Sequence, residues 1–266
     1  TPSNSSAASD VYKRQVKNRE HVLPLKKGIK VYIPKRHIRS YLNFMSMPTG
    51  DQTVTPMAKQ VAASYFHITE DPREADAALC FIESPISVGY DPKDREDGGN
   101  GYVPVTLQYR PYEAKTAREI SIAGGDPLEA SKDRGYKGKW NTAANEEDLD
   151  LILNMRKEMG EKPVIAIVTL KNPMVMAEFE PYTDAILVEY GVTPAAVLDV
   201  LTGAFDPEGL LPIQIPKDME TVEQQKEDVA FDMECYEDSE GHTYDFGYGM
   251  NFGGVIRDER TKKYVK

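Results

Sequence analysis

Short runs of apolar residues alternate with segments of helical periodicity along most of this chain. The runs are continuous rather than alternating with polar residues, which is typical of strands buried on both faces of a parallel sheet. Each run is too short for a helix, and most are rich in Val, Ile and Leu. We expect strands over residues 29–33, 77–82, 164–170 and 185–188.

Between these runs the apolar positions follow a helical period. The clearest case is 145–159, which begins at Asn145 with an acidic first turn, carries its apolar side chains on one face and ends at Gly160. Each of these features favours an amphipathic helix with defined ends. Further helices are expected over 56–66, 173–179 and 194–201, and an edge strand over 211–215, which contains a proline.

This order of elements predicts an α/β fold: a mostly parallel sheet with helices on both faces, which makes a three-layer sandwich. The segment 83–144, after the second strand, breaks the pattern because it is rich in Gly, Pro, Tyr and charged residues. It is too long for a plain connection, and segments of this kind are usually functional or disordered. We therefore expect a long irregular insertion there.

Composition narrows the possible partners. The chain has 266 residues, of which 40% are hydrophobic and 28% charged, so one large or two small globular domains are possible. Its net charge of −11 argues against a nucleic-acid or anionic-membrane partner, because phosphate binding needs a basic surface. The longest apolar run, 77–82, is far too short for a membrane span.

The sequence lacks the residue spacings that metal-binding and nucleotide-binding motifs require. The two cysteines, Cys80 and Cys235, form no CxxC motif, and the four histidines are scattered. GxGxxG after the first strand, GxxxxGK[ST] and the GxSxG nucleophile elbow are all absent from the sequence. We therefore expect no metal site, no cofactor and no serine-hydrolase chemistry.

Residues 1–15 differ from the rest of the chain. They are polar, rich in Ser and Ala, and show neither a helical nor a strand period, so we expect a disordered tail. The letters SSAASDVYKRQ also resemble translated read-through from a sequencing library, which indicates a truncated gene without its native N-terminus. No apolar signal-peptide core follows them.

Three segments carry motifs that occur together in one enzyme family. They are KNREHVLPLKK from Lys17, then PVIAIVTLKNPMVMAEF with DAILVEYGVTPAAVLDVLTGAFDPEGLLPIQIP, and YDFGYGMNF from Tyr244. In this order they resemble the C-terminal α/β sandwich domain of glycoside hydrolase family 3, the β-glucosidase and β-xylosidase family. The resemblance runs from Lys17 to Phe252. It implies an interdomain linker over 16–28, the sandwich domain over 29–252 and a tail over 253–266.

The resemblance implies part of an exo-acting retaining β-glycosidase, first of all a β-glucosidase, located in the periplasm or secreted. Such enzymes use two carboxylates, one as nucleophile and one as acid/base. The family carries its nucleophilic aspartate on a (β/α)8 barrel that precedes this domain, and the given chain lacks that barrel. The implied partners are the barrel and a carbohydrate substrate, and the chain alone is expected to be inactive.

The acid/base is implied on a loop of this domain. Glu83 follows the run 77–82, and ligand sites in open α/β sheets lie beyond the carboxyl ends of the strands. Its context, Glu83-Ser84-Pro85, is similar to the family's strand-Glu-x-Pro form. The alternative interpretation is that Glu83 merely ends a strand at the surface. Other candidates in the insertion, or simply a solvated charge run, are Asp91, Asp94, Glu96 and Asp97.

Aromatic and arginine side chains of the insertion are candidates for sugar binding, because aromatic planes suit the C–H faces of sugar rings. The alternative is that the aromatic residues hold the insertion against the domain. The predicted substrate-binding residues are Tyr90, Arg110, Tyr112 and Trp140.

Two other functions remain open at this point. One is a non-catalytic carbohydrate-binding or interaction module that keeps the fold without the chemistry. The other is an unrelated flavodoxin-like binding domain, although no phosphate-binding loop supports it.

Overall fold

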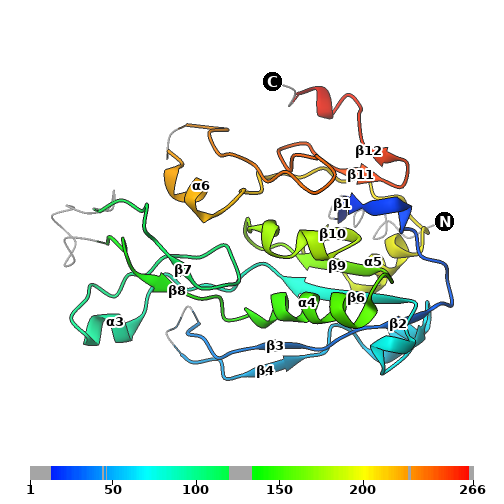
Figure 1. The fold of residues 1–266 in the computed structure, drawn as a ribbon, viewed down its shortest axis with the longest axis horizontal. Coiled ribbons are helices and arrows are strands. Elements are labelled where there is room, and N and C mark those ends of the chain that lie inside the picture. The colour runs from blue at the N-terminus through cyan, green and yellow to red at the C-terminus, as the bar shows by residue number, and fades with distance from the viewer. Residues whose placement is uncertain (1–12, 44, 46, 120–133, 227–228, 264–266) are drawn as a thin grey trace.

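A computed structural model describes residues 13–43, 45, 47–119, 134–226 and 229–263. Its main feature is an eight-stranded sheet with the order β12-β11-β1-β10-β9-β6-β2-β5 (Figure 1). Strands β10, β9, β6, β2 and β5 run parallel to one another, whereas β1, β11 and β12 pair antiparallel. The strands of this sheet are β1 (Lys13–Asn18), β2 (Lys30–Tyr32), β5 (His67–Ile68), β6 (Ala77–Glu83), β9 (Val164–Thr169), β10 (Ala185–Glu189), β11 (Met250–Asn251) and β12 (Gly254–Val255).

Helices cover both faces of this sheet, which confirms the predicted α/β sandwich. The continuous apolar strands bury alternate residues in two cores: Cys80 and Ile82 of β6 belong to one, Ala77 and Leu79 to the other. Helix α4 packs on the first face, and α2 and α5 contribute to the second. The helices are α2 (Lys59–Ala63), α3 (Pro92–Glu96), α4 (Glu147–Met159), α5 (Pro194–Leu201) and α6 (Met219–Gln224).

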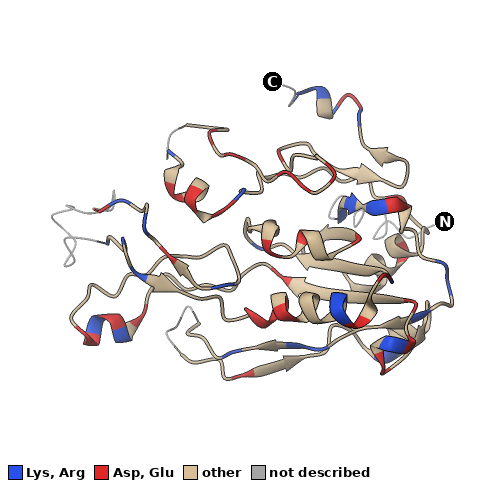
Figure 2. Ribbon diagram, viewed as in Figure 1, with Lys and Arg blue, Asp and Glu red and all other residues tan. Residues whose placement is uncertain are grey.

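Helix α4 has the acidic first turn that its sequence predicts. Its first turn is acidic and its last turn basic, as Figure 2 shows, which complements the helix dipole. Asn145, however, does not cap it. Its side chain instead donates to the Asp148 carboxylate at 2.8 Å and accepts from the Ile86 N–H at 2.7 Å. The expected helix start at Asn145 was therefore wrong: α4 begins at Glu147, and the side-chain oxygen of Asn145 accepts from Ile86 beyond β6 rather than from a helix N–H.

Two further element predictions were wrong. Residues 173–179 form only a single 3-10 turn, Met176–Glu178, because the preceding segment stays extended and Val175 N–H bonds to Leu107 C=O of the insertion. The expected strand at 211–215 does not form in the described structure. There the backbone bonds of Leu211 and Ile215 go to Tyr248 and Tyr244 in an irregular segment.

The N-terminal segment is also more ordered than expected. Lys13, Arg14 and Gln15, assigned above to a disordered tail, begin strand β1, which lies between β10 and β11. The register with β10 and β11 satisfies their backbone groups, which explains why a polar sequence can form an interior strand. Residues 1–12 lie outside the described residues.

The order β5-β2-β6-β9-β10 defines where ligands bind in such a sheet. The chain goes from β2 to one neighbour, β5, and then returns to the opposite side of β2 as β6. Loops that follow β2 and β6 therefore diverge at their carboxyl ends. Crevices at such a switch point are the usual ligand sites of open α/β sheets.

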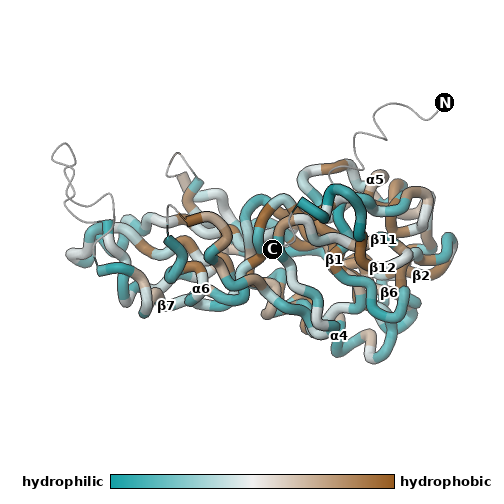
Figure 3. The backbone as a smooth tube through the Cα atoms, turned by 90° about the horizontal axis from the view of Figure 1, so that it is seen from above, coloured by the Kyte–Doolittle hydropathy of each residue, from teal (hydrophilic) through white to brown (hydrophobic). Residues whose placement is uncertain are grey.

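The loop after β2 enters a hairpin, and the loop after β6 enters the predicted insertion. The insertion forms an arm that projects beyond one end of the sheet together with α6 (Figures 1 and 3). Residues 120–133 at the end of this arm lie outside the described residues. The hairpin strands are β3 (Arg36–Ile38) and β4 (Gln52–Val54), and the arm contains α3, β7 (Tyr112–Glu113) and β8 (Trp140–Asn141).

Candidate active site at the carboxyl ends of β2 and β6

Glu83 is the last residue of β6 and lies at the switch point. Its side chain is 12% exposed and forms ion pairs with Lys171, which follows β9, and with Arg36 of β3, at 3.7 Å. The Glu83 backbone is held as well: its N–H donates to Asp148 at 3.2 Å, and its carbonyl accepts from the Tyr109 hydroxyl at 2.6 Å. Glu83 is therefore held by four different segments of the chain, two of which contact its carboxylate and two its backbone.

A buried ion pair lies beneath Glu83. The Arg36 guanidinium donates two hydrogen bonds to the Asp148 carboxylate, at 2.8 and 2.7 Å, and the Asp148 side chain is fully buried. Burial alone would lower the pKa of Arg36, but the hydrogen bonds and charge of Asp148 raise it above its usual value. Burial raises the pKa of Asp148, and the hydrogen bonds and charge of Arg36 oppose that shift. The fork geometry of the pair fixes Arg36 beside Glu83.

A second carboxylate supports the arm near this site. Glu178 accepts hydrogen bonds from the backbone N–H groups of Tyr109 and Arg110, at 2.6 and 3.1 Å. Burial raises the pKa of Glu178, although these two hydrogen bonds oppose the shift. Because it binds backbone groups, Glu178 fixes the return of the arm to the sheet, and with it the Tyr109 hydroxyl that contacts Glu83.

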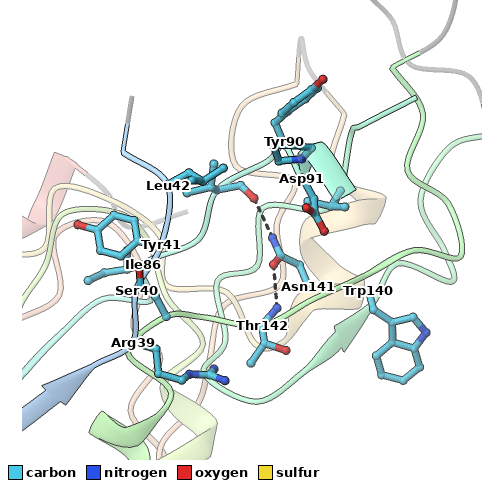
Figure 4. Close-up of a pocket in the computed structure, with 14 residues that line it drawn as sticks. Arg39, Ser40, Tyr41, Leu42, Ile86, Tyr90, Asp91, Trp140, Asn141 and Thr142 are labelled. Atoms are coloured by element: carbon cyan, nitrogen blue, oxygen red, sulfur yellow. Dashed lines mark hydrogen bonds between the residues drawn. The ribbon is translucent and has the colours of Figure 1, made fainter. Parts of the chain in front are cut away.

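A pocket of about 480 Å³ lies between the hairpin and the base of the arm (Figure 4). The predicted residues Tyr90 and Trp140 both line it, and Trp140 is 59% exposed at its rim. Tyr41 and Arg39 of the hairpin, not anticipated from the sequence, complete it. Three aromatic residues thus contribute to the lining of this open pocket, which also contains charged and polar side chains.

The other two predicted sugar-binding residues lie elsewhere. Arg110 lines a neighbouring pocket, where its guanidinium pairs with Glu146 at 3.1 Å and Asp150 at 2.6 Å. The Tyr112 hydroxyl donates to Glu223 of α6 at 3.2 Å, and Tyr112 lines neither pocket. The structure thus unites Tyr90 with Trp140 but separates both from Arg110 and Tyr112.

The rival carboxylates have structural contacts in the arm. Asp91 caps α3 by accepting from the Lys93 N–H at 2.9 Å, although it also lines the pocket. Asp94 pairs with Lys139 at 2.6 Å and accepts from the Gly101 N–H at 2.8 Å. Glu96 and Asp97, at the end of α3, are exposed.

One group of potential metal ligands occurs in the described residues, away from these pockets. Asp238, Glu240 and His242 each bring a ligand atom within 4.8 Å of the others. Asp238 already accepts from the backbone N–H groups of Glu240 and His242, at 2.9 and 2.8 Å, and from the Tyr244 hydroxyl at 3.1 Å. These hydrogen bonds are those of a tight turn, which accounts for the cluster without an ion.

The signal that could have revealed Arg36 was present in the sequence. Arg36 lies three residues after the first predicted strand and Glu83 lies directly after the second, and side chains that follow adjacent parallel strands come together at one edge of a sheet. Asp148 gave no such signal, because an acidic first turn is ordinary in an exposed helix.

The helices of the described residues also differ from what a membrane span requires. None of them combines the length and the hydrophobicity that a transmembrane helix needs.

The fold and the carboxylate at its switch point define an α/β sandwich domain with a pocket near the carboxyl edge of its sheet. Residues 16–252 match the model of the glycosyl hydrolase family 3 C-terminal domain. The chain therefore belongs to glycosyl hydrolase family 3, as its C-terminal domain.

Curated relatives match over shorter stretches. β-Glucosidase C of Emericella nidulans is 36% identical over 90 residues, which is 34% of this chain and 14% of that protein. Probable β-glucosidase C of Aspergillus flavus is 33% identical over 100 residues, 38% of this chain and 15% of that protein. The matched region thus covers about a seventh of these relatives' own length.

Solved structures share the fold over nearly the whole chain. β-Glucosidase D2-BGL from Chaetomella raphigera superposes with a TM-score of 0.53 at 15% identity, over 93% of this chain and 36% of that one. β-Glucosidase 3B from Thermotoga neapolitana, in complex with glucose, gives a TM-score of 0.51 at 17% identity, over 93% of this chain and 37% of that one. This chain spans about a third of the length of these structures.

Proposed function

We propose that this chain is the C-terminal domain of an exo-acting retaining β-glycosidase, with β-glucosidase the activity of the whole protein, and that Glu83 is its acid/base. The family match over 16–252 carries the proposal, and the curated relatives that match are named β-glucosidases. The position of Glu83 at the switch point supports its role, because substrates of open α/β sheets bind there.

The second carboxylate in this proposal is an aspartate on a barrel domain that precedes the chain in the whole protein. In the first step its oxygen bonds to the sugar C1 while the C1–O bond to the leaving group breaks and Glu83 gives its proton to the departing oxygen. In the second step a water oxygen bonds to C1, its proton passes to the Glu83 carboxylate, and the bond between C1 and the aspartate breaks. Glu83 thus alternates between acid and base.

The test is the variant Glu83→Gln in the whole protein, with aryl β-glucosides of different leaving groups. We expect a loss of about 100-fold or more on a poor leaving group, a smaller loss on a good one and partial rescue by azide. Glu96→Gln, an exposed carboxylate in the same arm, is the matched control and should keep wild-type rates. Wild-type rates in Glu83→Gln on the poor leaving group would place the acid elsewhere.

The aromatic pocket favours a second candidate function, a non-catalytic carbohydrate-binding module, because this chain forms the pocket by itself and Glu83 does not line it. Trp140 is the single tryptophan of the sequence, so tryptophan fluorescence reports on this pocket alone. Titration with cellobiose should shift the emission of this chain, and Tyr41→Ala or Tyr90→Ala should weaken binding. Tyr182→Ala, an exposed tyrosine outside the pocket, is the control.

The two candidates make different predictions. A catalytic domain loses turnover in Glu83→Gln, whereas a binding module binds cellobiose and shows no turnover that depends on Glu83, even in the whole protein. Unchanged Trp140 emission at saturating sugar would contradict the module and the assignment of Tyr90 and Trp140 to substrate binding.

A further inference from the structure

Glu83 has two cationic partners in the described part of the chain, and they differ in accessibility. Arg36 is 9% exposed, whereas Lys171 is 64% exposed. Lys171 reaches Glu83 Oε1 and Arg36 reaches Oε2, so each carboxylate oxygen faces one cation. One partner is therefore fixed in the protein interior and the other is in contact with water.

Arg36 is already neutralised by another group. Its Nε and Nη2 donate to the two oxygens of Asp148 at 2.8 and 2.7 Å, and only Nη1 faces Glu83, at 3.7 Å. Because Asp148 is fully buried, Arg36 cannot leave it without stranding a charge. Lys171 is consequently the counter-ion that belongs to Glu83 itself.

The backbone fixes where the Lys171 side chain starts but not where it ends. The N–H groups of Lys171 and Asn172 donate to the Ser84 hydroxyl at 3.0 and 3.3 Å, and the Ser84 N–H donates to Thr169 C=O at 3.1 Å. The loop after β9 is thereby attached to the residue after Glu83. From this anchored point the flexible four-carbon side chain of Lys171 can contact the carboxylate or extend into solvent.

The remaining groups around Glu83 cannot exchange in this way. Asp148 of α4 accepts the Glu83 N–H and stays paired with Arg36. The Tyr109 hydroxyl from the arm donates to the Glu83 carbonyl at 2.6 Å, and burial raises the pKa of Tyr109, so this phenol stays neutral. Lys171 is thus the accessible charged group among those that face Glu83 in the described structure.

We propose that Lys171 is a positioning residue for Glu83, and that its contact with the carboxylate changes as Glu83 alternates between base and acid in the proposed reaction. Its ammonium pairs with the carboxylate while Glu83 acts as base, and it turns into solvent while Glu83 carries the proton. The inference rests on the acid/base role proposed above. A cation in contact favours the charged form of a carboxylate, so loss of the Lys171 ammonium should favour the protonated form of Glu83.

The experiment compares Lys171→Met and Lys171→Arg in the whole protein by the pH profile of kcat/KM on a β-glucoside with a poor leaving group. We expect the alkaline limb of Lys171→Met to move to higher pH, because the carboxylate loses its counter-ion. Lys171→Arg should keep the wild-type limb. Lys217→Met, which removes an exposed lysine paired with Glu234, is the matched control and should not move it.

Three results would overturn the inference: an alkaline limb in Lys171→Met that superposes on wild type, an equal shift in both Lys171 variants, or a rise in KM at every pH without a shift. Its failure is separable from failure of the proposed function. If Glu83→Gln abolishes turnover but Lys171→Met moves no limb, only the role of Lys171 is lost. If Glu83→Gln is silent, the acid/base assignment falls first.

Discussion

At the scale of single residues, the burial of a charge decides how much its partner matters. Asp148 and Asp150 lie two residues apart on α4, and each pairs with an arginine, Arg36 and Arg110 respectively. The first pair is buried and the second is exposed by 40% or more on both sides. Removal of one partner of a buried pair leaves an uncompensated charge, whereas water takes over from a lost surface partner.

Asp148→Asn should therefore destabilise the chain by about 3 kcal/mol, measured as the free energy of unfolding in urea. Asp150→Asn should change it by less than about 1 kcal/mol. Equal effects of the two variants would show that Arg36 and Asp148 contribute no more than a surface pair. A large loss of stability in Asp148→Asn would support the view that the buried Arg36–Asp148 pair holds the structure around Glu83.

At the scale of elements, the Glu223 carboxylate links helix α6 to the arm. Glu223 accepts from the hydroxyls of Tyr112 and Tyr136, at 3.2 and 3.4 Å. Burial raises the pKa of Glu223, and the two hydroxyls oppose the shift without cancelling it. The folded chain thus binds this proton more tightly than the unfolded chain, where the value is near 4.5.

Glu223 therefore contributes stability that is fully present below pH 4.5 and is lost as the pH rises through its folded value. Glu223→Gln keeps an acceptor for the tyrosines but has no such loss. Relative to wild type, the variant should gain stability between pH 4 and 7, by less than about 1 kcal/mol because the group is half exposed. Urea unfolding at both pH values measures this, with Glu220→Gln, exposed on the same helix, as the control. If Glu223→Gln were more stable than wild type only at pH 4, the pH dependence would have the opposite sign, and the role given to Glu223 would be wrong.

Four elements followed closely from local sequence patterns, whereas the helix expected over 56–66 is only Lys59–Ala63 and that over 173–179 is a single 3-10 turn. Helix α5 has the predicted bounds, and β6, β9 and β10 differ from the predicted runs by one residue at one end. Strand β1 could not be predicted, because a polar strand shows no apolar period and gains its order only from β10 and β11 on either side. The expected strand at 211–215 failed for the opposite reason, since its local pattern found no strand to pair with in the described sheet.

At the scale of the whole molecule, the chain offers one carboxylate at its switch point and an aromatic pocket beside the arm. A double displacement at C1 needs two carboxylates about 5 Å apart. Under the proposed function, the second belongs to a domain that this chain does not contain. Binding and chemistry are then divided between two parts of one protein.

The chain by itself should accordingly show no turnover of aryl β-glucosides, while the whole protein should hydrolyse them. Release of the aryl group, followed by absorbance at equal molar concentrations, measures both. Turnover by the chain that disappears in Glu83→Gln would contradict the division of the carboxylates. Turnover that persists in Glu83→Gln would point to a contaminating hydrolase in the preparation.

The sequence by itself determined the layers, the family and the place of Glu83, because continuous apolar runs, helical periods and ordered motifs are local properties of a chain. Tertiary structure alone decided which charges meet: Arg36 and Asp148 are 112 residues apart, and Lys171 reaches Glu83 from another strand end. It also decided which predicted sugar-binding residues share a pocket, uniting Tyr90 with Trp140. The physical reason is that side-chain encounters depend on strand order and on the path of the arm, which hydrophobic periodicity does not encode.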